Sequence, residues 1–250
     1  MRFIIWNCNG ALRNKLNEAD SFNADLLIIQ ECENPAQSTK QYEDWAGNYL
    51  WLGTNKNKGV GIFPKNGHTV KRLHWSGEFR IQGLNTSSAS TSWNTEDLQL
   101  FLPFRFNDKL NFLGCWTKGR DSQAFGYIGQ FWKYLQIHRD ELNQPNTIIA
   151  GDFNSNAIWD KQDRWWSHTD TINELSAIGI ESLYHHQTGE NQGQESQPTF
   201  YLHRNETKPY HIDYVFMTKK LLTKANLEIG KIGDWLSVSD HMPICVTFED

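Results

Sequence analysis

Five short segments of this sequence place carboxylate, amide or imidazole side chains directly after an apolar, strand-like run. In chain order they are Trp6-Asn7, Gln30-Glu31, Gly151-Asp152-Phe153-Asn154, His211-Ile212-Asp213-Tyr214 and Ser239-Asp240-His241-Met242-Pro243. A rigid strand can hold such groups over a cleft, where binding and catalytic residues concentrate. A single carboxylate at a strand end is more often a cap or turn residue. The recurrence over five segments is what indicates a shared site.

The donor types in these segments favour a hard divalent cation. Carboxylate and amide oxygens suit Mg²⁺ or Mn²⁺, whereas zinc sites use Cys or His ligands at a spacing that this pattern lacks. Such an ion has a use in phosphoester hydrolysis, because an anionic phosphodiester repels hydroxide and gains charge in its transition state. The reaction also needs a fixed base or orienting group for the attacking water.

The same segments, in this order and spacing, resemble those of the endonuclease/exonuclease/phosphatase superfamily, which is also called DNase I-like. The match runs from Trp6-Asn7 to Ser239–Pro243 and so covers the whole chain. In size the chain is nearest to members of the exonuclease III and AP endonuclease type. The resemblance implies an α/β fold, a four-layer sandwich of two facing mixed β-sheets flanked by helices, and a single catalytic domain over residues 1–250.

The resemblance also implies a role for each polar side chain. Glu31 would bind Mg²⁺ or Mn²⁺, with Asn7 beside it, and Asp240 would be a further contact to the metal or its water. Asp152 would activate or orient the attacking water. Asn154 would hold that water or a phosphate oxygen.

A histidine and an aspartate complete the implied catalytic set. His241 would donate a hydrogen bond to a non-bridging phosphate oxygen, and Asp213 would accept one from its other ring nitrogen. The chemistry agrees, because a carboxylate behind an imidazole fixes its tautomer and favours its charged form. Structural alternatives stay open: a turn-capping carboxylate at Asp213, a core histidine at His241, and a backbone contact between strands at Asn7.

The segment after the strand 111–116 departs from the family pattern. Many relatives place a His or Tyr there that touches the phosphate, whereas this chain has Trp116, followed by Lys118 and Arg120. An indole offers one N–H donor and no exchangeable acid, so Trp116 could bind phosphate or stack on a base but could not protonate a leaving group. Lys118 and Arg120 could supply positive charge instead. A core position for Trp116 and a solvated loop for the two cations are the alternatives.

Aromatic residues are frequent, with 11 Trp, 8 Tyr and 14 Phe, and several stand near the motifs. Trp159, Arg164 and Trp165 follow the Gly-Asp-Phe-Asn segment, and Trp93 stands in a polar stretch where no core is evident. Base stacking is worth ~1–3 kcal/mol per base and tolerates any base sequence. We therefore expect substrate contacts from Arg164 and Trp165, although one of two adjacent tryptophans there normally faces the core. His185-His186 is expected at the surface.

The composition bounds the remaining possibilities. A net charge of −5 and a pI of about 6.0 give no general affinity for polyanions, so binding of nucleic acid needs a local site. The four cysteines lack C-x-x-C spacing, which favours free thiols in a reducing compartment. The apolar runs are too short to span a bilayer, and the first residues form a strand rather than a signal peptide. We expect a cytoplasmic monomer without a membrane partner.

Strand-like and helix-like patterns alternate along the whole chain, without a repeat or a dividing linker. Strands are predicted over 3–8, 26–30, 59–63, 98–106, 111–116, 147–151, 198–201, 212–217 and 243–248. Helical periodicity covers 124–142 and 166–178. The polar stretches 85–92 and 187–197 are predicted surface loops, for which both a function and disorder remain open.

Together these patterns predict a metal-dependent phosphodiesterase, and most specifically a nuclease that hydrolyses DNA or RNA and leaves a 5′-phosphate. A second hypothesis is a phosphatase or phosphodiesterase of small nucleotides or phospholipid headgroups. A third is a nucleic-acid-binding scaffold that kept the fold without catalysis. A groove lined by basic or aromatic residues that extends beyond the site of one phosphate would favour a nuclease. A closed pocket would favour an enzyme for small substrates.

Overall fold

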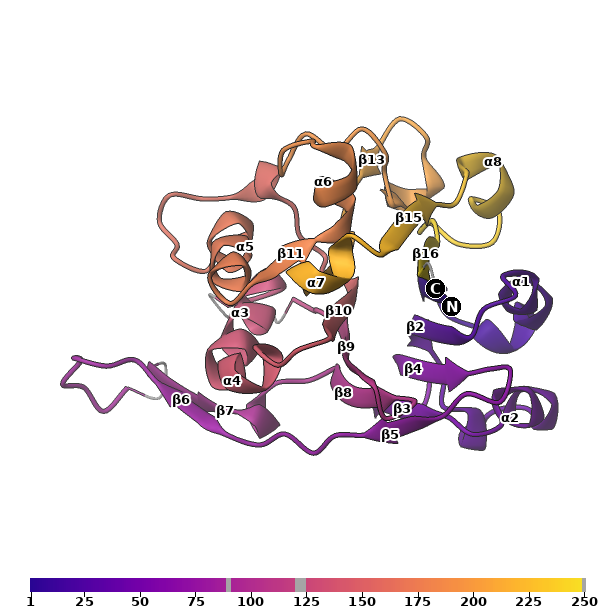
Figure 1. Ribbon diagram of the computed structural model, residues 1–250, viewed down its shortest axis with the longest axis horizontal. Helices are drawn as coiled ribbons and strands as arrows, with labels where there is room; N and C mark the ends of the chain where they lie inside the picture. The colour runs from indigo at the N-terminus through magenta and orange to yellow at the C-terminus, as the bar shows by residue number, and fades with distance from the viewer. Residues whose placement is uncertain (89–90, 120–124, 249–250) are drawn as a thin grey trace.

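Two six-stranded mixed sheets face each other in the computed structural model, which describes residues 1–88, 91–119 and 125–248 (Figure 1). The first sheet has the order β15 (Ala225–Ile229), β16 (Ile244–Phe248), β1 (Arg2–Asn7), β2 (Leu26–Cys32), β4 (Lys58–Pro64), β3 (Leu50–Asn55). The second has the order β11 (Ile180–Ser182), β14 (Asp213–Thr218), β10 (Thr147–Asp152), β9 (Leu110–Trp116), β8 (Phe101–Phe106), β5 (Val70–Arg72). The pairs β1/β2 and β9/β10 are parallel, and the other neighbours are antiparallel.

Successive side chains along a strand point alternately into the central core and toward the outer layers. Phe3 and Ile5 of β1 point into the core between the sheets, whereas Ile4 and Trp6 point to the outer face. This is the period of two that a strand buried on both faces requires. The inner core continues through β2, β4, β9, β10 and β14, and so joins the two sheets.

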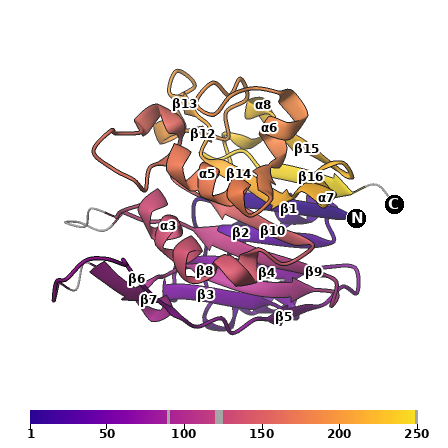
Figure 2. The same ribbon diagram turned by 60° about the vertical axis from the view of Figure 1, so that its left-hand side comes forward.

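Helices cover the two outer faces (Figure 1), and the turned view of Figure 2 brings those over the second sheet to the front. On the first sheet lie α1 (Leu16–Ser21) and α2 (Lys40–Ala46), whose apolar residues pack with Ile4 and Trp6. On the second lie α3 (Ile128–Ile137), α4 (Arg139–Leu142) and α5 (His168–Ala177). The helices α6 (Leu183–Thr188), α7 (Lys219–Leu222) and α8 (Ile232–Trp235) connect the last strands. The predicted four-layer α/β sandwich is therefore confirmed.

The predicted element boundaries differ from the structure where side chains cap or interrupt the chain. The helix expected over 166–178 begins at His168, because Ser167 and Asp170 form a capping box in front of it. The helix expected over 124–142 is two helices that meet at His138, and residue 124 lies outside the described residues. The strand expected over 198–201 is only the short β12 (Phe200–Tyr201), which pairs with β13 (Pro209–Tyr210).

In the polar stretch 85–92, residues 89 and 90 lie outside the described residues, and the others belong to a hairpin that projects from the sandwich (Figure 1). Its strands are β6 (Glu78–Arg80) and β7 (Ser92–Asn94). Trp93 is buried with Trp132 and Trp166, so our expectation of a tryptophan outside any core was wrong. The packing partners come from α3 and the segment before α5, which a local pattern cannot indicate. No helix within the described residues has the length and apolar character needed to cross a membrane.

Strand direction brings the polar motifs to one edge of the sandwich. The parallel strands β1 and β2 both end at that edge, and β10 ends there with Asp152. Because β14 runs antiparallel to β10, its first residue, Asp213, is the cross-strand partner of Asp152. Gly151 permits this arrangement, since it has a φ of +155° and a Cβ there would lie 1.9 Å from the carbonyl oxygen of Cys115.

Candidate active site

The buried amide of Asn7 links two carboxylates at the end of β1. Its Nδ2 donates to Asp152 Oδ2 at 2.9 Å and to Glu31 Oε1 at 3.3 Å. Its Oδ1 accepts from the backbone N–H of Asn9 at 3.0 Å, which fixes which amide atom faces the carboxylates. Asn7 therefore holds Glu31 and Asp152 side by side, although they come from different sheets.

Glu31 projects from a β-bulge in β2. The register with β4 shifts between Gln30 and Cys32, and Glu31 itself has a φ of +62°. A bulge turns the direction of a side chain, and positive φ is uncommon outside glycine, so this conformation is typical of a functional position. Its Oε2 forms an ion pair with the ammonium group of Lys58 at the start of β4.

Asp152 is almost fully buried and accepts three hydrogen bonds. Two of them come from Asn154, whose backbone N–H donates to Oδ1 at 2.8 Å and whose Nδ2 donates to Oδ2 at 2.9 Å. Asn7 donates the third. Burial and the negative charge of Asp213 raise the pKa of Asp152 to about 7, against the opposing influence of His241. A carboxylate with a pKa near neutrality is suited to accept a proton from water.

His241 lies between the two buried aspartates. Its Nδ1 is 2.9 Å from Asp213 Oδ2, and its Nε2 is 4.0 Å from Asp152 Oδ2. Because a carboxylate only accepts, Nδ1 carries a hydrogen. Burial opposes the charge of His241, but Asp213, Asp152 and Asp240 overcome it and raise the pKa to about 9. The ring is therefore an imidazolium at neutral pH, with Nε2–H available as a donor.

The donor set fits a hard divalent cation. Within the described residues, one group of three His, Cys, Asp or Glu residues offers ligand atoms within 4.8 Å of one another, and it consists of Asp152, Asp213 and His241. A protonated His241 is a poor metal ligand, so oxygen atoms remain as the donors. Glu31 adds a carboxylate next to Asp152 through Asn7. Oxygen ligands of this kind suit Mg²⁺ or Mn²⁺.

Asp240 is half-buried beside this group. Its backbone carbonyl accepts from the N–H of Tyr201 at 2.8 Å, which ties the segment to β12. Its negative charge contributes to the raised pKa of His241. A role in metal binding stays a prediction for Asp240, as it does for Asn7 and Glu31.

The residues expected to contact substrate are more dispersed. Trp116 is 4% exposed and packs in the core between the sheets, with the ammonium group of Lys118 lying 3.8 Å from its ring centroid. Arg120 lies outside the described residues. Arg164 lines a cavity that also touches Asn154, whereas the exposed Trp165 lines a different hollow beside α5. The burial of Trp116 favours its alternative role in the core.

A family profile and solved structures identify the relatives of this chain. The profile of the Endonuclease/Exonuclease/phosphatase family matches residues 4–241. This chain belongs to that family. It is therefore a hydrolase acting on phosphoester bonds, and the family is generally dependent on a divalent metal. None of the curated protein sequences matches the chain.

Solved structures of the same fold come from Neisseria, Archaeoglobus fulgidus and Leishmania major. The 3′ phosphatase NExo from Neisseria, bound to a product DNA hairpin, has a TM-score of 0.70 and 16% identity over 100% of both chains. An AP endonuclease from Archaeoglobus fulgidus has a TM-score of 0.64 and 16% identity over 100% of both chains. The AP endonuclease from Leishmania major has a TM-score of 0.61 and 14% identity over 100% of this chain and 87% of the other. At these identities the likeness supports the fold alone.

Three side chains that support this family site had no assigned role in the sequence prediction. Ser239 Oγ donates to the carbonyl of Asn7 at 2.7 Å and accepts from the N–H of His241 at 3.1 Å. Thr199 Oγ1 accepts from the N–H of Asp213 at 3.0 Å, and Lys58 pairs with Glu31. Ser239 stands within a recognised motif, whereas nothing local to Thr199 or Lys58 marks them.

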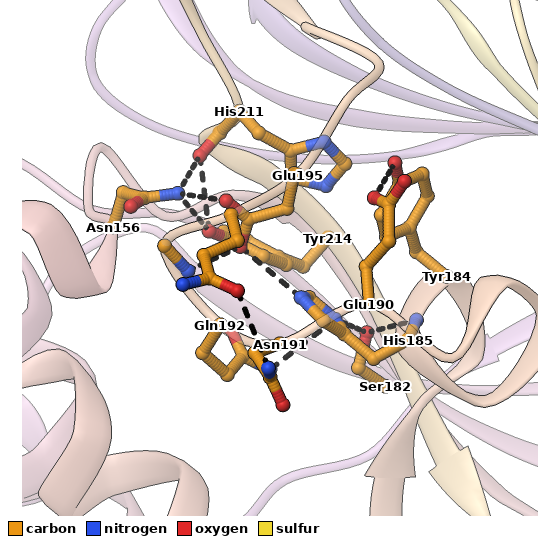
Figure 3. Close-up of polar contacts among 12 residues, drawn as sticks. Asn156, Ser182, Tyr184, His185, Glu190, Asn191, Gln192, Glu195, His211 and Tyr214 are labelled. Carbon is orange, nitrogen blue, oxygen red and sulfur yellow. Dashed lines mark hydrogen bonds and ion pairs between the residues drawn. The ribbon is translucent and has the colours of Figure 1, made fainter.

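The 187–197 loop is held by a polar network against residues 153–156, the active-site loop that follows β10 (Figure 3). Asn156 Nδ2 donates to Glu195 Oε2 at 3.0 Å, and His185 Nε2 donates to Glu195 Oε1 at 3.1 Å. Although burial opposes its charge, these hydrogen bonds lower the pKa of Glu195 to about 2. Our prediction of a surface position was wrong for His185, whose side chain is 12% exposed, and right for His186.

His168 joins the same network as a neutral ring. Its Nδ1 accepts from Ser155 Oγ and its Nε2 donates to Gln192 Oε1, each at 3.1 Å. Burial lowers the pKa of His168 to about 4, although hydrogen bonding to Gln192 and the charges of Asp160 and Glu195 favour protonation. The folded protein therefore keeps this histidine uncharged at a pH where an unfolded chain would protonate it.

We expect His168 to make the folding stability fall as the pH decreases from about 6.5 to about 4. The unfolded ring binds its proton near pH 6.5 and the folded ring near pH 4, which corresponds to about 3 kcal/mol over that interval. The measurement is the free energy of unfolding in urea against pH for the wild type and for His168→Gln. In the variant, the free energy of unfolding should no longer show this decrease between about pH 6.5 and pH 4. Equal slopes for both proteins would contradict the assignment.

We expect replacement of Trp116 to reduce stability more than catalysis. Trp116→Ala opens a cavity in the core between the sheets and should cost about 3–5 kcal/mol of unfolding free energy. Trp116→Phe should cost less, because an aromatic ring remains beneath Lys118. Urea unfolding and kcat/KM, measured on both variants, separate the two roles. A large loss of kcat/KM at unchanged stability would instead place Trp116 in contact with substrate.

Proposed function

We propose that this protein is a divalent-metal-dependent nuclease that hydrolyses phosphodiester bonds of DNA or RNA and leaves a 5′-phosphate. The whole chain, residues 1–250, would act as one catalytic domain and as a monomer. The observation that carries the proposal is the position of Asp152, which is bound by Asn7 and Asn154 and lies 4.0 Å from His241 Nε2. A carboxylate for water and an imidazolium for phosphate thus share one site.

The arrangement supports in-line hydrolysis of a phosphodiester. His241 Nε2–H donates to a non-bridging phosphate oxygen, and Asp213 holds the ring in that orientation. Asp152 accepts a proton from water as the water oxygen bonds to phosphorus. The bond from phosphorus to the 3′ oxygen breaks, and that oxygen takes a proton from solvent. The products are a 5′-phosphate and a 3′-hydroxyl group.

Glu31, with Asp240, would hold the metal ion, and Asn7 would contact the metal site by orienting the Glu31 carboxylate through its Nδ2. Bound Mg²⁺ or Mn²⁺ supplies positive charge that stabilises the phosphate oxygens as negative charge develops on them. Lys58 lies beside Glu31 and adds a further cation near the phosphate position. Asn154 orients Asp152 through two hydrogen bonds and keeps the carboxylate directed toward the water.

Nucleic acid is favoured as the substrate by the nature of the structural relatives. NExo is described as a 3′ phosphatase bound to a product DNA hairpin, and two other relatives are AP endonucleases. The acidic net charge of −5 requires that binding come from local cations and aromatic rings. Lys58 and Lys118 stand at the edge where Asp152 lies, which supports a local site for a polyanion.

The decisive experiment is incubation with Mg²⁺ or Mn²⁺ and a panel of phosphoesters. The panel contains single- and double-stranded DNA, RNA, an abasic duplex and small phosphodiesters, and products are resolved by length and end group. We expect shortened DNA or RNA strands with 5′-phosphates, and none with Asp152→Asn. Turnover of small esters alone would favour the small-substrate hypothesis, and binding of nucleic acid without any turnover would favour a scaffold.

A further inference from the structure

A cavity of about 260 Å³ borders the active site at Asn154. The residues around it that this argument uses are Tyr127, Asn154, Trp159, Lys161, Arg164 and Trp166. Asn154 also donates to Asp152, so one side chain touches both the catalytic carboxylate and the cavity. Pockets for drug-sized ligands have volumes of ~300–1,000 Å³, so this cavity suits a single planar ring system.

We propose that this cavity binds a nucleobase next to the scissile phosphate, by stacking and without strong preference for one base. The inference rests on the proposed function, because it places the phosphate at His241 and Asp152. A nucleotide bound there has its base one sugar away from the phosphate. The cavity begins at Asn154, next to that position, and so lies within reach of the base.

Two aromatic rings of the cavity remain exposed and are held in place. Trp159 is 47% exposed and Tyr127 is 51% exposed, which is unusual for such large apolar side chains. The ring of Trp159 packs against Tyr210 at a centroid distance of 5.1 Å. Tyr127 has a φ of +51°, and its N–H donates to the carbonyl of Lys118 at 3.0 Å. Fixed, exposed ring faces are what base stacking requires.

The turn that carries Trp159 is anchored in the polar network of Figure 3. Asn156 Oδ1 accepts from the N–H of Ile158 at 3.0 Å, and its Nδ2 donates to Glu195, to the carbonyl of His211 and to the hydroxyl of Tyr214. Asn156 is 2% exposed, so it serves as a rigid floor of the cavity. The position of Trp159 is thereby fixed relative to the active-site loop.

The floor of the cavity, formed by Asn156 and His168, contacts the base without hydrogen-bonding to its polar edge. The amide atoms of Asn156 are engaged as described, and both ring nitrogens of His168 are bound by Ser155 and Gln192. A site discriminates bases strongly only where its polar groups depend on the base for a partner. Recognition here therefore depends on the ring faces, which every base presents.

Two cations at the cavity complete a nucleotide site. Lys161 and Arg164 both line it, and the Nε of Arg164 lies 3.6 Å from the exposed carboxylate of Asp163. A weak, exposed ion pair of this kind is readily exchanged for a phosphate, since arginine matches phosphate geometry. These side chains offer charge for a phosphate other than the one at His241.

The test compares binding of dAMP, dTMP and 2-deoxyribose 5-phosphate by calorimetry in Mg²⁺. We expect both nucleotides to bind roughly 5–100-fold more tightly than the sugar phosphate, which is the range that stacking of one base gives. Trp159→Ala should remove that advantage, and Trp159→Phe should keep most of it. Ile158→Ala is the matched control, because Ile158 is 54% exposed in the same turn and does not line the cavity.

The outcomes separate this inference from the proposed function. An advantage of the nucleotides that Trp159→Ala leaves intact, or that Ile158→Ala removes equally, would overturn the base site. So would equal binding of nucleotide and sugar phosphate by an enzyme that cleaves nucleic acid. A base advantage that depends on Trp159 in a protein that cleaves no nucleic acid would support the site while refuting the nuclease. Melting temperatures of all variants identify any loss of folding.

Discussion

Replacement of Asp152 by asparagine is expected to lower kcat by ~10²–10⁴-fold, which is the usual contribution of a positioned general base. The amide keeps the shape of the side chain but cannot accept a proton from water. Burial and Asp213 raise the pKa of Asp152, so its charge destabilises the folded protein. Removal of that charge offsets the hydrogen bonds that the amide nitrogen cannot accept, so the melting temperature should change little. Steady-state kinetics, substrate binding and the melting temperature are the measurements.

His241→Ala is the companion variant and should lower kcat by ~10²–10³-fold, as expected for a lost donor to the transition state. Asp25→Asn is the control, because Asp25 precedes β2 at its opposite end and accepts from the N–H of Arg2 at 2.9 Å. It should retain full activity. A near-normal kcat with a sharply raised KM in either site variant would show that its assigned role is wrong.

Removal of divalent metal with EDTA is expected to abolish turnover, and Mg²⁺ or Mn²⁺ should restore it. The site collects buried carboxylates, and a phosphodiester needs positive charge that His241 alone does not supply. Metal binding can be followed without turnover by the electron paramagnetic resonance of Mn²⁺. Full activity in EDTA would contradict the metal assignment.

Glu31→Gln tests which side chain holds the ion. We expect its affinity for Mn²⁺ to fall by at least ~10-fold, since even residues that only orient metal ligands contribute 10–100-fold. Glu33→Gln is the control two residues further on. The Glu33 carboxylate accepts from the backbone N–H groups of Leu12 and Arg13, so this variant should lower stability and leave Mn²⁺ affinity unchanged. An unchanged affinity in Glu31→Gln would exclude Glu31 as a ligand.

The sandwich was predictable because most of its strands carry a local signal. The runs Leu26–Gln30 and Thr147–Gly151 are rich in apolar and β-branched residues. They form most of the buried strands β2 and β10. Short edge strands such as β5 and β11 were missed, since three residues at a sheet edge carry too little pattern. Helices α1 and α2 were missed as well, because their six or seven residues span fewer than two turns.

The candidate site was only partly predictable. The motif residues Asn7, Asp152 and His241 stand at strand ends that the sequence marks. In the structure Asn7 donates a hydrogen bond to Asp152, and His241 Nε2 lies 4.0 Å from the same carboxylate. Their catalytic roles stay a prediction. The burial of Trp93 was not predicted, because its packing partners lie in α3 and before α5. The sequence did not decide between order and disorder for the 187–197 loop, because the residues that hold it, Asn156, His168 and His185, are not marked by any local pattern.

By itself the sequence determined the periodicity of the strands, the chemical types at their ends, and hence a family whose members hydrolyse phosphoesters. Those properties depend on neighbouring residues and survive in a linear pattern. Tertiary structure alone decided that Asn7 bonds to Asp152, that Lys58 pairs with Glu31, and that Trp159 borders a cavity at Asn154. Such contacts join residues far apart in the chain, and their geometry is fixed by how the two sheets pack rather than by any local preference.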